Sequence, residues 1–353
     1  MEKIKVVIVG AGGYGGCGAI ELLLGHPRAE ICALIDKEQV GTPISELYPH
    51  LKGFCDMPIK NPEQAECPED AQVVFFSTPD GVGQKEAARW LKKGIKVIDY
   101  SGDFRFNNLK TYEGYAARIG RDPGHAAPDL LPQSVYGLAE LHRSKIQGSN
   151  LVGNPGCFAV SCILGLSPAM DAQLIDPGTI ICDAKTGVSG AGKNPNPTFH
   201  YPARYDAMNA YKVSGHQHVY EIETELGRIA GESIAITFTP HVVPLSRGIL
   251  TTIYGRINQG INLKSVIDKY RDFYREDRFV RVFGPETPQV STHVRGSNFC
   301  NICLNLDERT GNLIIVSLID NLVKGQAGSA VQNMNLLFGL DETEGLLHPG
   351  MYP

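Results

Sequence analysis

Of the residues in this chain that could act as a nucleophile, Cys157 has the most favourable position. It follows an Asn-Pro-Gly turn at residues 154–156 and opens the apolar segment CFAVSCILGLSP, which we predict to be a helix. A thiol at a helix N-terminus has its thiolate favoured by the helix dipole and by unpaired backbone N–H groups. Most cysteines are inert packing residues, but this position makes Cys157 the best candidate for covalent catalysis.

A second group of candidates lies in the segment SGHQHVYEIE, which carries His216, His218 and Glu221. An imidazole beside a cysteine could act as general base and acid, with Glu221 orienting it. Residues two apart point in different directions in the first turn of a helix, so we expect at most one ring to face the thiol. The alternatives are solvated histidines at a helix start and a metal pair. No second H-x-H or carboxylate cluster with ligand spacing accompanies them, so we predict no metal site.

A glycine-rich loop near the N-terminus has the spacing G-x-G-x-x-G at Gly10, Gly12 and Gly15. It follows an apolar, β-branched run at residues 4–9 and precedes a helical pattern. In that context the glycines permit a tight turn, close approach to a pyrophosphate and close helix packing. We therefore predict a dinucleotide site rather than a generic glycine turn. The predicted cofactor site also includes Gly13, Tyr14, Ser77, Thr78 and Pro79.

Asp36 ends the second predicted strand, about 20 residues after the last loop glycine. A carboxylate there accepts a ribose 2′-hydroxyl and repels a 2′-phosphate, so taken alone it indicates NAD. Lys37 and Lys52 lie nearby in the sequence and could offset the charge. The local chemistry leaves NAD and NADP both open.

The elements that must position these residues change in character after Asn154. Before it, near-continuous apolar runs alternate with helical patterns, which is typical of a parallel sheet covered on both faces. After it, few helices separate the strands, and we expect a mostly antiparallel sheet. A last amphipathic helix could return to the first domain. The strands expected after Asn154 span residues 179–187, 232–243, 248–257, 299–306 and 312–322.

Composition limits the possible functions. With 353 residues, two domains are expected at roughly 150 residues per domain. Hydrophobic residues make up 42% and charged residues 20%, which excludes disordered, collagen-like and coiled-coil classes. A net charge of −5 disfavours nucleic-acid binding, so we expect small-molecule partners.

Targeting signals and cysteine usage indicate a cytoplasmic protein. The first apolar run is too short for a secretory or membrane segment. Nine scattered cysteines, an odd number, predict free thiols, including the C-x-x-C of Cys300 and Cys303 in a predicted strand.

Eight motifs, taken together and in order, carry a specific resemblance: GAGGYGG, VIDYSGDFR, VYGLAEL, GNPGCF, GVSGAGK, SGHQHVYEI, FTPHVVPLSRGIL and DNLVKGQAGSAVQNMNLLFG. The chain resembles the N-acetyl-gamma-glutamyl-phosphate reductase family of arginine biosynthesis, from the first strand to about Leu346. The resemblance implies NADPH-dependent reduction of an acyl phosphate through a cysteine thioester. It also implies a homo-oligomer, either a dimer or a tetramer.

The fold implied by the resemblance is α/β, as in the related aspartate-semialdehyde dehydrogenases. We expect a Rossmann dinucleotide-binding domain at residues 1–154, completed by a C-terminal helix at 325–353. Residues 155–324 would form an α+β catalytic and dimerisation domain.

The resemblance also implies roles for individual residues. His216 would carry the proton, because the family's catalytic histidine is the first of the H-x-H, with His218 as the alternative. Asn321 resembles the position that meets the nicotinamide carboxamide. Arg105 follows the fourth strand at the carboxyl edge of the sheet, where its guanidinium suits phosphate oxygens; a surface pair with Asp103 is the alternative. The remaining substrate candidates are Ser189 and Lys193 for phosphate and Arg247 for a carboxylate.

The chain departs from the family pattern at two places. Asp36 stands where NADP-dependent members accommodate a 2′-phosphate, and the stretch NPGCFAVS replaces NPGCY-P-T, which leaves the nucleophile but changes its packing.

The same residues are compatible with two other functions. A reductase of carrier-linked aminoadipyl phosphate in lysine biosynthesis would need a basic pocket rim, and the loop offers only Lys193 and Arg204. A non-catalytic dinucleotide-binding regulator is disfavoured because Cys157, His216 and Arg105 are all present.

Overall fold

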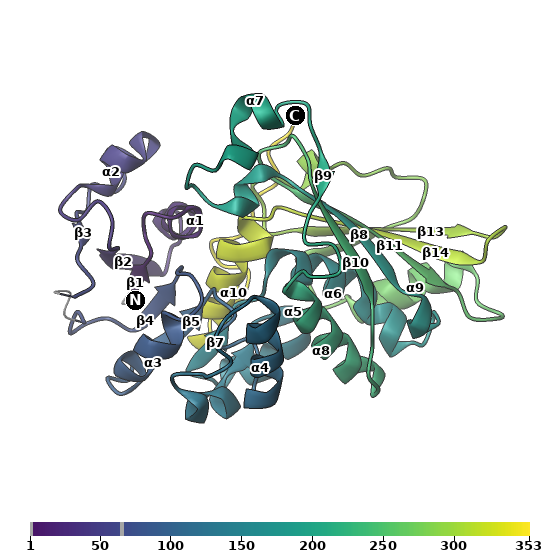
Figure 1. Ribbon diagram of the computed structural model, residues 1–353, viewed down its shortest axis with the longest axis horizontal. Helices are drawn as coiled ribbons and strands as arrows, with labels where there is room; N and C mark the ends of the chain where they lie inside the picture. Colours follow the sequence, from purple (N-terminus) through teal and green to yellow (C-terminus); the bar gives the residue numbers. More distant parts are fainter. Residues whose placement is uncertain (1–2, 64–66) are drawn as a thin grey trace. The chain divides into compact units, whose positions relative to one another are not determined.

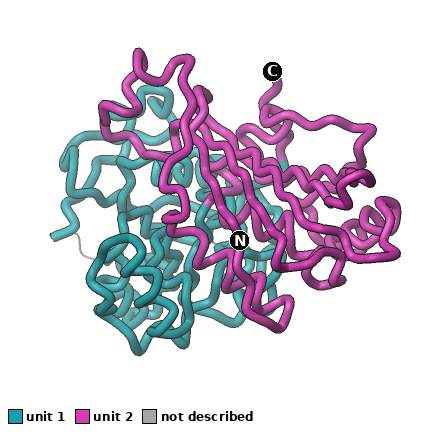
Figure 2. The backbone as a smooth tube through the Cα atoms, turned by 45° about the vertical axis from the view of Figure 1, so that its right-hand side comes forward, with its two compact units in different colours: residues 1–156, 326–347 teal, residues 157–325, 348–353 magenta. Residues whose placement is uncertain are grey.

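The computed structural model describes residues 3–63 and 67–353, which form two compact units (Figure 2). Unit 1 consists of residues up to 156 together with 326–347, and unit 2 of residues 157–325 together with 348–353. From the sequence we expect domain boundaries at 154/155 and 324/325, close to those of the structure. We also expect the last six residues in the first domain, whereas in the structure they belong to unit 2.

Unit 1 is built on a parallel sheet whose seven described strands have the order β3-β2-β1-β4-β5-β7-β6 (Figure 1). The strands are β1 (Ile4–Val9), β2 (Ala29–Ile35), β3 (Ile59–Lys60), β4 (Val73–Phe76), β5 (Lys96–Asp99), β6 (Val135–Tyr136) and β7 (Leu151–Gly153). The helices are α1 (Tyr14–Leu24), α2 (Ile44–Leu47), α3 (Gly83–Leu91), α4 (Leu109–Arg118), α5 (Ala139–Gln147) and α10 (Gly328–Leu337), with short 3₁₀ turns η1 (Pro49–Leu51) and η2 (Pro128–Gln133). Every residue of β4 is buried, as expected for an inner strand covered on both faces.

The C-terminal helix α10 packs against α1 and α5 of unit 1. All ten of its residues are buried. The Asn333 amide donates hydrogen bonds to the carbonyl of Gly137 and to Oδ1 of Asn154, at 2.8 and 3.1 Å. The helix thereby holds the residue that starts the Asn-Pro-Gly turn.

Unit 2 contains a mixed sheet whose described strands have the order β12-β13-β14-β11-β8-β10-β9 (Figure 1). The strands are β8 (Ile181–Thr186), β9 (Asn209–Ala210), β10 (Thr237–Val242), β11 (Ile249–Arg256), β12 (Val280–Phe283), β13 (Cys300–Asp307) and β14 (Asn312–Ile319). The helices are α6 (Cys157–Asp171), α7 (Tyr201–Arg204), α8 (His218–Ala230) and α9 (Leu263–Phe273), with 3₁₀ turns η3 (Pro177–Thr179), η4 (Val188–Ala191), η5 (Pro197–Phe199) and η6 (Ser291–His293). A π-helical turn, η7 (Val323–Ala327), leads into α10.

The prediction of an α/β fold is confirmed, but the expectation of a mostly antiparallel second sheet is wrong in detail. β8 pairs with β10 in parallel, and β12 pairs with β13 in parallel. The connection from β8 to β10 contains α8, and a helical crossover lets the next strand start again in the same direction. Apolar patterning shows where strands lie and does not show their direction.

The helix α6 is the centre of unit 2. It packs against β11 and β14 on one side and against α8 and α9 on others, and its residues from Phe158 to Met170 are all buried. Ser161 Oγ lies 2.9 Å from Thr251 Oγ1 and 3.1 Å from Ser317 Oγ, which ties the helix to the sheet at one register. In the described part of the chain, no helix is both long and apolar enough to cross a membrane.

The loop after β5 in unit 1 is organised by two buried carboxyl groups. Asp103 accepts hydrogen bonds from the backbone N–H of Gly81 and Gln84, at 2.8–3.1 Å. Asp99 is fully buried, and its Oδ1 accepts the Ser101 N–H at 2.6 Å. A Cβ at Gly83 would lie 1.5 Å from Asp99 Oδ2, so only glycine fits there. Burial, reinforced by the charge of Asp103, raises the pKa of Asp99 to about 7.

The raised pKa of Asp99 can be tested through the pH dependence of protein stability. A carboxyl group whose pKa is higher in the folded than in the unfolded state binds more protons when folded, so stability falls as pH rises from about 4 through about 7. We expect Asp99→Asn to remove this loss, so the urea midpoint of the variant rises relative to the parent between pH 5 and pH 8. The exposed Asp129→Asn is the control and should show a constant difference. A constant difference for Asp99→Asn as well would contradict the buried titration.

Candidate active site

In unit 2, Cys157 is the first residue of the 15-residue helix α6. Cys157 and Cys32 are half-buried, whereas the other seven cysteines are buried. The first N–H groups and the dipole of α6 favour a thiolate at this position. The structure therefore places the predicted nucleophile at a helix N-terminus with partial access to solvent.

Aromatic contacts bring both predicted histidines to the first turn of α6. The ring of Phe158, next to Cys157, has its centroid 5.4 Å from that of His216 and 6.1 Å from that of His218. Phe238 on β10 closes the group, 5.4 Å from Phe158 and 5.3 Å from His216. The centroids of the two imidazoles lie 4.7 Å apart, so the rings contact each other. The expectation that at most one of them faces the thiol stays a prediction.

The proton on His216 is fixed by the backbone of α8. The N–H of His218 donates a hydrogen bond to His216 Nδ1 at 3.2 Å. Since Nδ1 accepts, the neutral ring carries its proton on Nε2. His216 thus presents Nε2–H as its hydrogen-bond donor.

Glu221 lies near His218. Its side chain is fully buried, and Oε1 lies 3.9 Å from His218 Nε2, one turn earlier in α8. The carboxylate therefore lies beside His218, whose backbone N–H donates to His216.

Two residues of this group, Tyr211 and Gly325, are not among the site residues predicted from the sequence. Burial raises the pKa of Tyr211, and the charge of Cys157 adds to that shift. The Tyr211 ring also packs on His216, with centroids 5.7 Å apart. A Cβ at Gly325 would lie 2.7 Å from Cys157 Cβ, so the π-helical turn η7 requires glycine here. The glycines of the stretch GQAG at residues 325–328 are a sequence signal for close packing of the backbone at Gly325. No sequence pattern marks Tyr211.

Most of the other substrate candidates gather where β14 ends. Asn321 Nδ2 donates to Ser189 Oγ at 3.0 Å, and Asn321 Oδ1 accepts the Gly248 N–H at 2.7 Å. Arg247 Nη1 lies 3.8 Å from Oδ2 of the fully buried Asp320. Lys193 is half-buried and follows η4 in the same loop as Ser189.

In unit 1 the glycine loop lies at the carboxyl ends of the neighbouring strands β1 and β4. Gly10 has φ of +83°, and a Cβ there would lie 2.2 Å from the Ser77 carbonyl oxygen. A Cβ at Gly15 would lie 2.5 Å from Ser77 Oγ. Gly13 is the N-cap of α1, and no side chain caps the helix, so backbone N–H groups face the loop where an anion can bind. Tyr14 begins α1, and Thr78 and Pro79 continue the turn beyond Ser77.

Asp36 faces this loop. Its Oδ2 accepts the Gly12 N–H at 2.9 Å, and its Oδ1 accepts the Glu38 N–H at 3.2 Å. Lys37, the next residue, is exposed. The loop therefore fits a dinucleotide, with one carboxylate partly satisfied by backbone donors.

Arg105 is buried in unit 1 rather than on the surface. Its Nε donates to the Asn154 carbonyl at 2.9 Å, and its Nη2 donates to the Tyr100 carbonyl at 2.5 Å. Arg105 thus bonds to the backbone carbonyl of Asn154, the first residue of the turn, whereas Asn333 bonds to its side chain.

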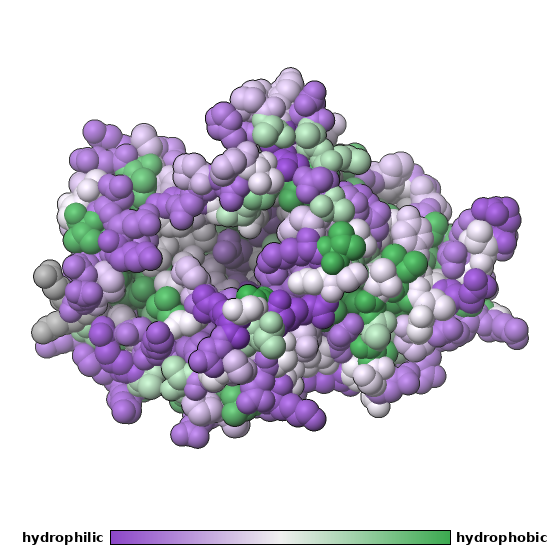
Figure 3. All heavy atoms as spheres, in the orientation of Figure 1, coloured by the Kyte–Doolittle hydropathy of each residue, from purple (hydrophilic) through white to green (hydrophobic). Residues whose placement is uncertain are grey.

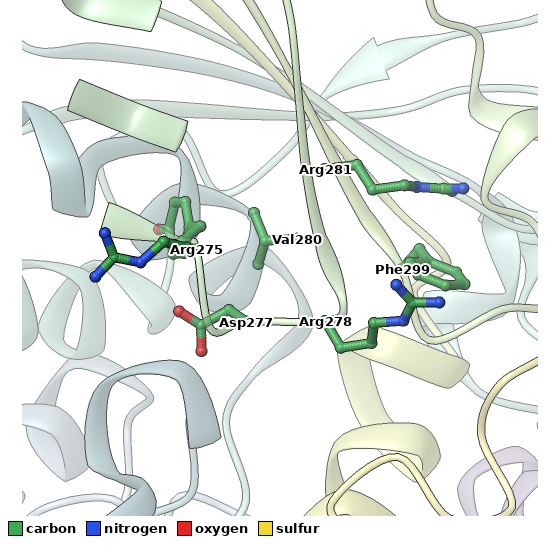
Figure 4. A pocket seen from close by; sticks show the side chains of 7 residues that line it. Arg275, Asp277, Arg278, Val280, Arg281 and Phe299 are labelled. Atoms are coloured by element: carbon green, nitrogen blue, oxygen red, sulfur yellow. The ribbon is translucent and has the colours of Figure 1, made fainter. Parts of the chain in front are cut away.

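A separate pocket of about 380 Å³ lies in unit 2, and its lining includes none of the predicted site residues. Figure 4 shows the guanidinium of Arg281 beside Phe299, where Cζ lies 4.1 Å from the ring centroid. Arg281 also donates to Asn301 at 2.8 Å. The pocket is lined by Tyr274, Arg275, Asp277, Arg278, Val280, Arg281 and Phe299.

Comparisons with known proteins agree with this layout. Residues 5–149 match the family model "Semialdehyde dehydrogenase, NAD binding domain", and residues 157–321 match "Semialdehyde dehydrogenase, dimerisation domain". Among solved structures, aspartate semialdehyde dehydrogenase II of Vibrio cholerae superposes with a TM-score of 0.71 at 19% identity, covering 96% of this chain and 99% of that one. The enzyme of Candida albicans, solved with NADP, has a TM-score of 0.67 at 16% identity, covering 96% and 99%. These likenesses show the fold.

Curated relatives are much closer in sequence. N-acetyl-gamma-glutamyl-phosphate reductase of Desulforudis audaxviator is 43% identical, over 99% of this chain and 100% of the relative. The reductase of Bacillus mycoides is 42% identical over the same shares. With identity at this level along essentially the full length, the chain belongs to the N-acetyl-gamma-glutamyl-phosphate reductase family.

Proposed function

We propose that the protein reduces N-acetyl-gamma-glutamyl phosphate to N-acetylglutamate 5-semialdehyde and phosphate, with NADPH, in arginine biosynthesis. The observation that carries the proposal is Cys157 at the N-terminus of α6 with His216 packed on the adjacent Phe158, in a chain with full-length relatives of that name. It is an oxidoreductase of the semialdehyde dehydrogenase type.

The first half-reaction is acyl transfer to sulfur. The Cys157 thiolate attacks the acyl carbon, the bond between that carbon and the phosphate oxygen breaks, and phosphate leaves. The N–H groups at the start of α6 keep the sulfur anionic before attack. The product of this half-reaction is a thioester on Cys157.

The second half-reaction reduces that thioester. When bound at the glycine loop, the reduced nicotinamide supplies the hydride. His216, in its imidazolium form, transfers the Nε2 proton to the oxygen that gains charge, and removes that proton again when the thiohemiacetal collapses. The aldehyde leaves, and the thiolate of Cys157 is restored.

NADP is the proposed cofactor, and NAD is the alternative that Asp36 suggests. The Asp36 carboxylate accepts two backbone N–H bonds, which offset part of its negative charge, and exposed Lys37 offers a cation for a 2′-phosphate. Ser189, Lys193 and Arg247 are proposed substrate ligands. Arg105 remains a proposed phosphate ligand and also positions the turn before Cys157.

The protein is also proposed to form a homo-oligomer through the sheet of unit 2. Along β11, Leu250, Thr252 and Tyr254 point away from the buried face and stay half-exposed. On β8, Ile181 is 45% exposed. Figure 3 shows hydrophobic side chains at the surface over these strands. Lys185 and Asp183 of β8 are the register partners of Leu250 and Thr252 and lie on the same face, which is therefore mixed. Its exposed apolar side chains are typical of a surface that a second copy covers.

The assay that tests the function follows reduced cofactor by absorbance, with N-acetylglutamate 5-semialdehyde, phosphate and NADP. We expect turnover in the parent and a loss of several orders of magnitude in Cys157→Ser with folding intact. Cys162→Ala, in the same helix, is the matched control, because burial raises the pKa of its thiol and keeps it inert. Full activity in Cys157→Ser would refute the thioester mechanism.

Thiol labelling gives an independent readout. Iodoacetamide should modify Cys157 first, because Cys32, the other half-buried cysteine, has its pKa raised to about 11 by burial. Mass spectrometry after brief labelling locates the adduct. An adduct on Cys32 before Cys157 would contradict the assignment.

The proposed roles of His216 and His218 can be distinguished by measuring kcat/KM for a variant of each. His216→Asn should lower it about 100- to 10,000-fold, whereas His218→Asn should cost less, because His218 acts through its contacts with His216. Loss of the proton carrier should flatten one limb of the pH profile, and loss of the orienting residue should only shift it. If His218→Asn shows the deeper defect and the flattened limb, the two roles are reversed.

Cofactor choice is tested by kcat/KM with NADP and with NAD. We expect the parent to prefer NADP, Asp36→Asn to increase that preference by removing charge, and Lys37→Ala to reduce it. A tenfold or greater preference of the parent for NAD, about 1.4 kcal/mol, would show that the Asp36 charge dominates.

A further inference from the structure

Three potential metal ligands converge in unit 1, outside the residues assigned to the reaction. Cys17 and Glu21 lie one turn apart on α1, and His50 lies on η1. His50 Nε2 is 2.8 Å from Glu21 Oε1, and Cys17 Sγ is 3.8 Å from the same oxygen. All three ligand atoms lie within 4.8 Å of one another. Two elements separated in sequence thus bring a sulfur, an oxygen and a nitrogen donor to one point.

We propose that Cys17, Glu21 and His50 form a binding site for a transition-metal cation of the Zn²⁺ type. Thiolate, imidazole and carboxylate are the donors that Zn²⁺ takes in proteins, whereas Mg²⁺ and Ca²⁺ take oxygen donors. With metal–ligand distances near 2.0–2.3 Å, tetrahedral ligands stand roughly 3–4 Å apart. The separations of Glu21 Oε1 from His50 Nε2 and from Cys17 Sγ, 2.8 and 3.8 Å, need only small side-chain shifts to match these values. A fourth position is left for water.

The burial of the three residues suits entry of an ion from solvent. Cys17 is only 6% exposed, whereas the side chains of Glu21 and His50 are 36% and 55% exposed. The thiol therefore forms the floor of the site, and the other two ligands form an open rim. The hydrogen bond between His50 and Glu21 already holds the rim together.

The site is connected to the glycine loop. The Cys17 N–H donates to the Gly13 carbonyl at 2.9 Å. The hydroxyl of Tyr48 donates to the Gly12 carbonyl at 2.9 Å, and the Tyr48 and His50 rings pack edge-on, with centroids 6.1 Å apart. A cation that joins His50 to α1 would restrain both contacts, so we expect metal binding to raise the thermal stability of the chain.

The test uses Co²⁺ as the probe, because a thiolate bond to Co²⁺ absorbs by charge transfer and bonds to carboxylate or imidazole do not give that band. The full chain carries Cys157→Ser, which removes the reactive thiol as a competing ligand. We expect one equivalent of Co²⁺ per chain, a charge-transfer band, displacement by Zn²⁺ and a higher melting temperature. Adding Cys17→Ser should abolish the band, and adding Cys32→Ser, which changes the other half-buried thiol, should leave it unchanged.

If Cys17→Ser does not fold, a substitution of the exposed ligand His50 tests the metal site instead. His50→Gln removes a donor at the rim, where the side chain is 55% exposed, and should weaken Co²⁺ binding at least tenfold without loss of folding. Glu21→Gln should act in the same direction. Absence of the band, a band that survives Cys17→Ser, or unchanged Co²⁺ affinity in His50→Gln would each overturn the proposal.

Discussion

The burial of α6 within unit 2 is the constraint on which the site depends. Every residue from Phe158 to Met170 is buried, and burying one large apolar side chain contributes about 1.5–3 kcal/mol, so the helix cannot slide or turn without a large loss. Polar bonds fix its register further. Ser161 bonds to the sheet, and the hydroxyls of Tyr270 on α9 and of Tyr274 just after it donate to the helix carbonyls of Gly165 and Leu164. The first residue of a helix held in this way has a fixed position, and that residue is the cysteine.

Much of the fold could be predicted because long strands leave a long pattern. The runs of β1 and β2 are mainly apolar, and the sequence places the first at residues 4–9 and the end of the second at Asp36, next to the observed end at Ile35. β3, β6 and β9 have two residues each, too few for any pattern to emerge. The direction of β10 and β13 relative to their neighbours depends on the path of the connecting chain, which apolar spacing does not record.

The candidate site could be predicted only in part, because some of its contacts join segments that lie far apart in the sequence. Cys157 and the glycine loop were recognisable because local sequence creates their chemistry, through a helix start and a strand-turn-helix. The contacts of Gly325 with Cys157, of Tyr211 with His216 and of His50 with Glu21 join segments far apart in the chain. A single sequence shows each of these residues but not its neighbour.

The packing of Gly325 against Cys157 has a consequence for the order in which the enzyme becomes functional during synthesis. The two residues are 168 positions apart (325 − 157), and the turn that carries Gly325 is anchored by the Asp320 carboxylate, which accepts the N–H groups of Leu322 and Val323. Chains fold from the N-terminus as they leave the ribosome. Cys157, the proposed nucleophile, therefore lacks its final surroundings in a nascent chain until residue 325 has emerged. These surroundings are completed only after the described strands of both sheets have been synthesised.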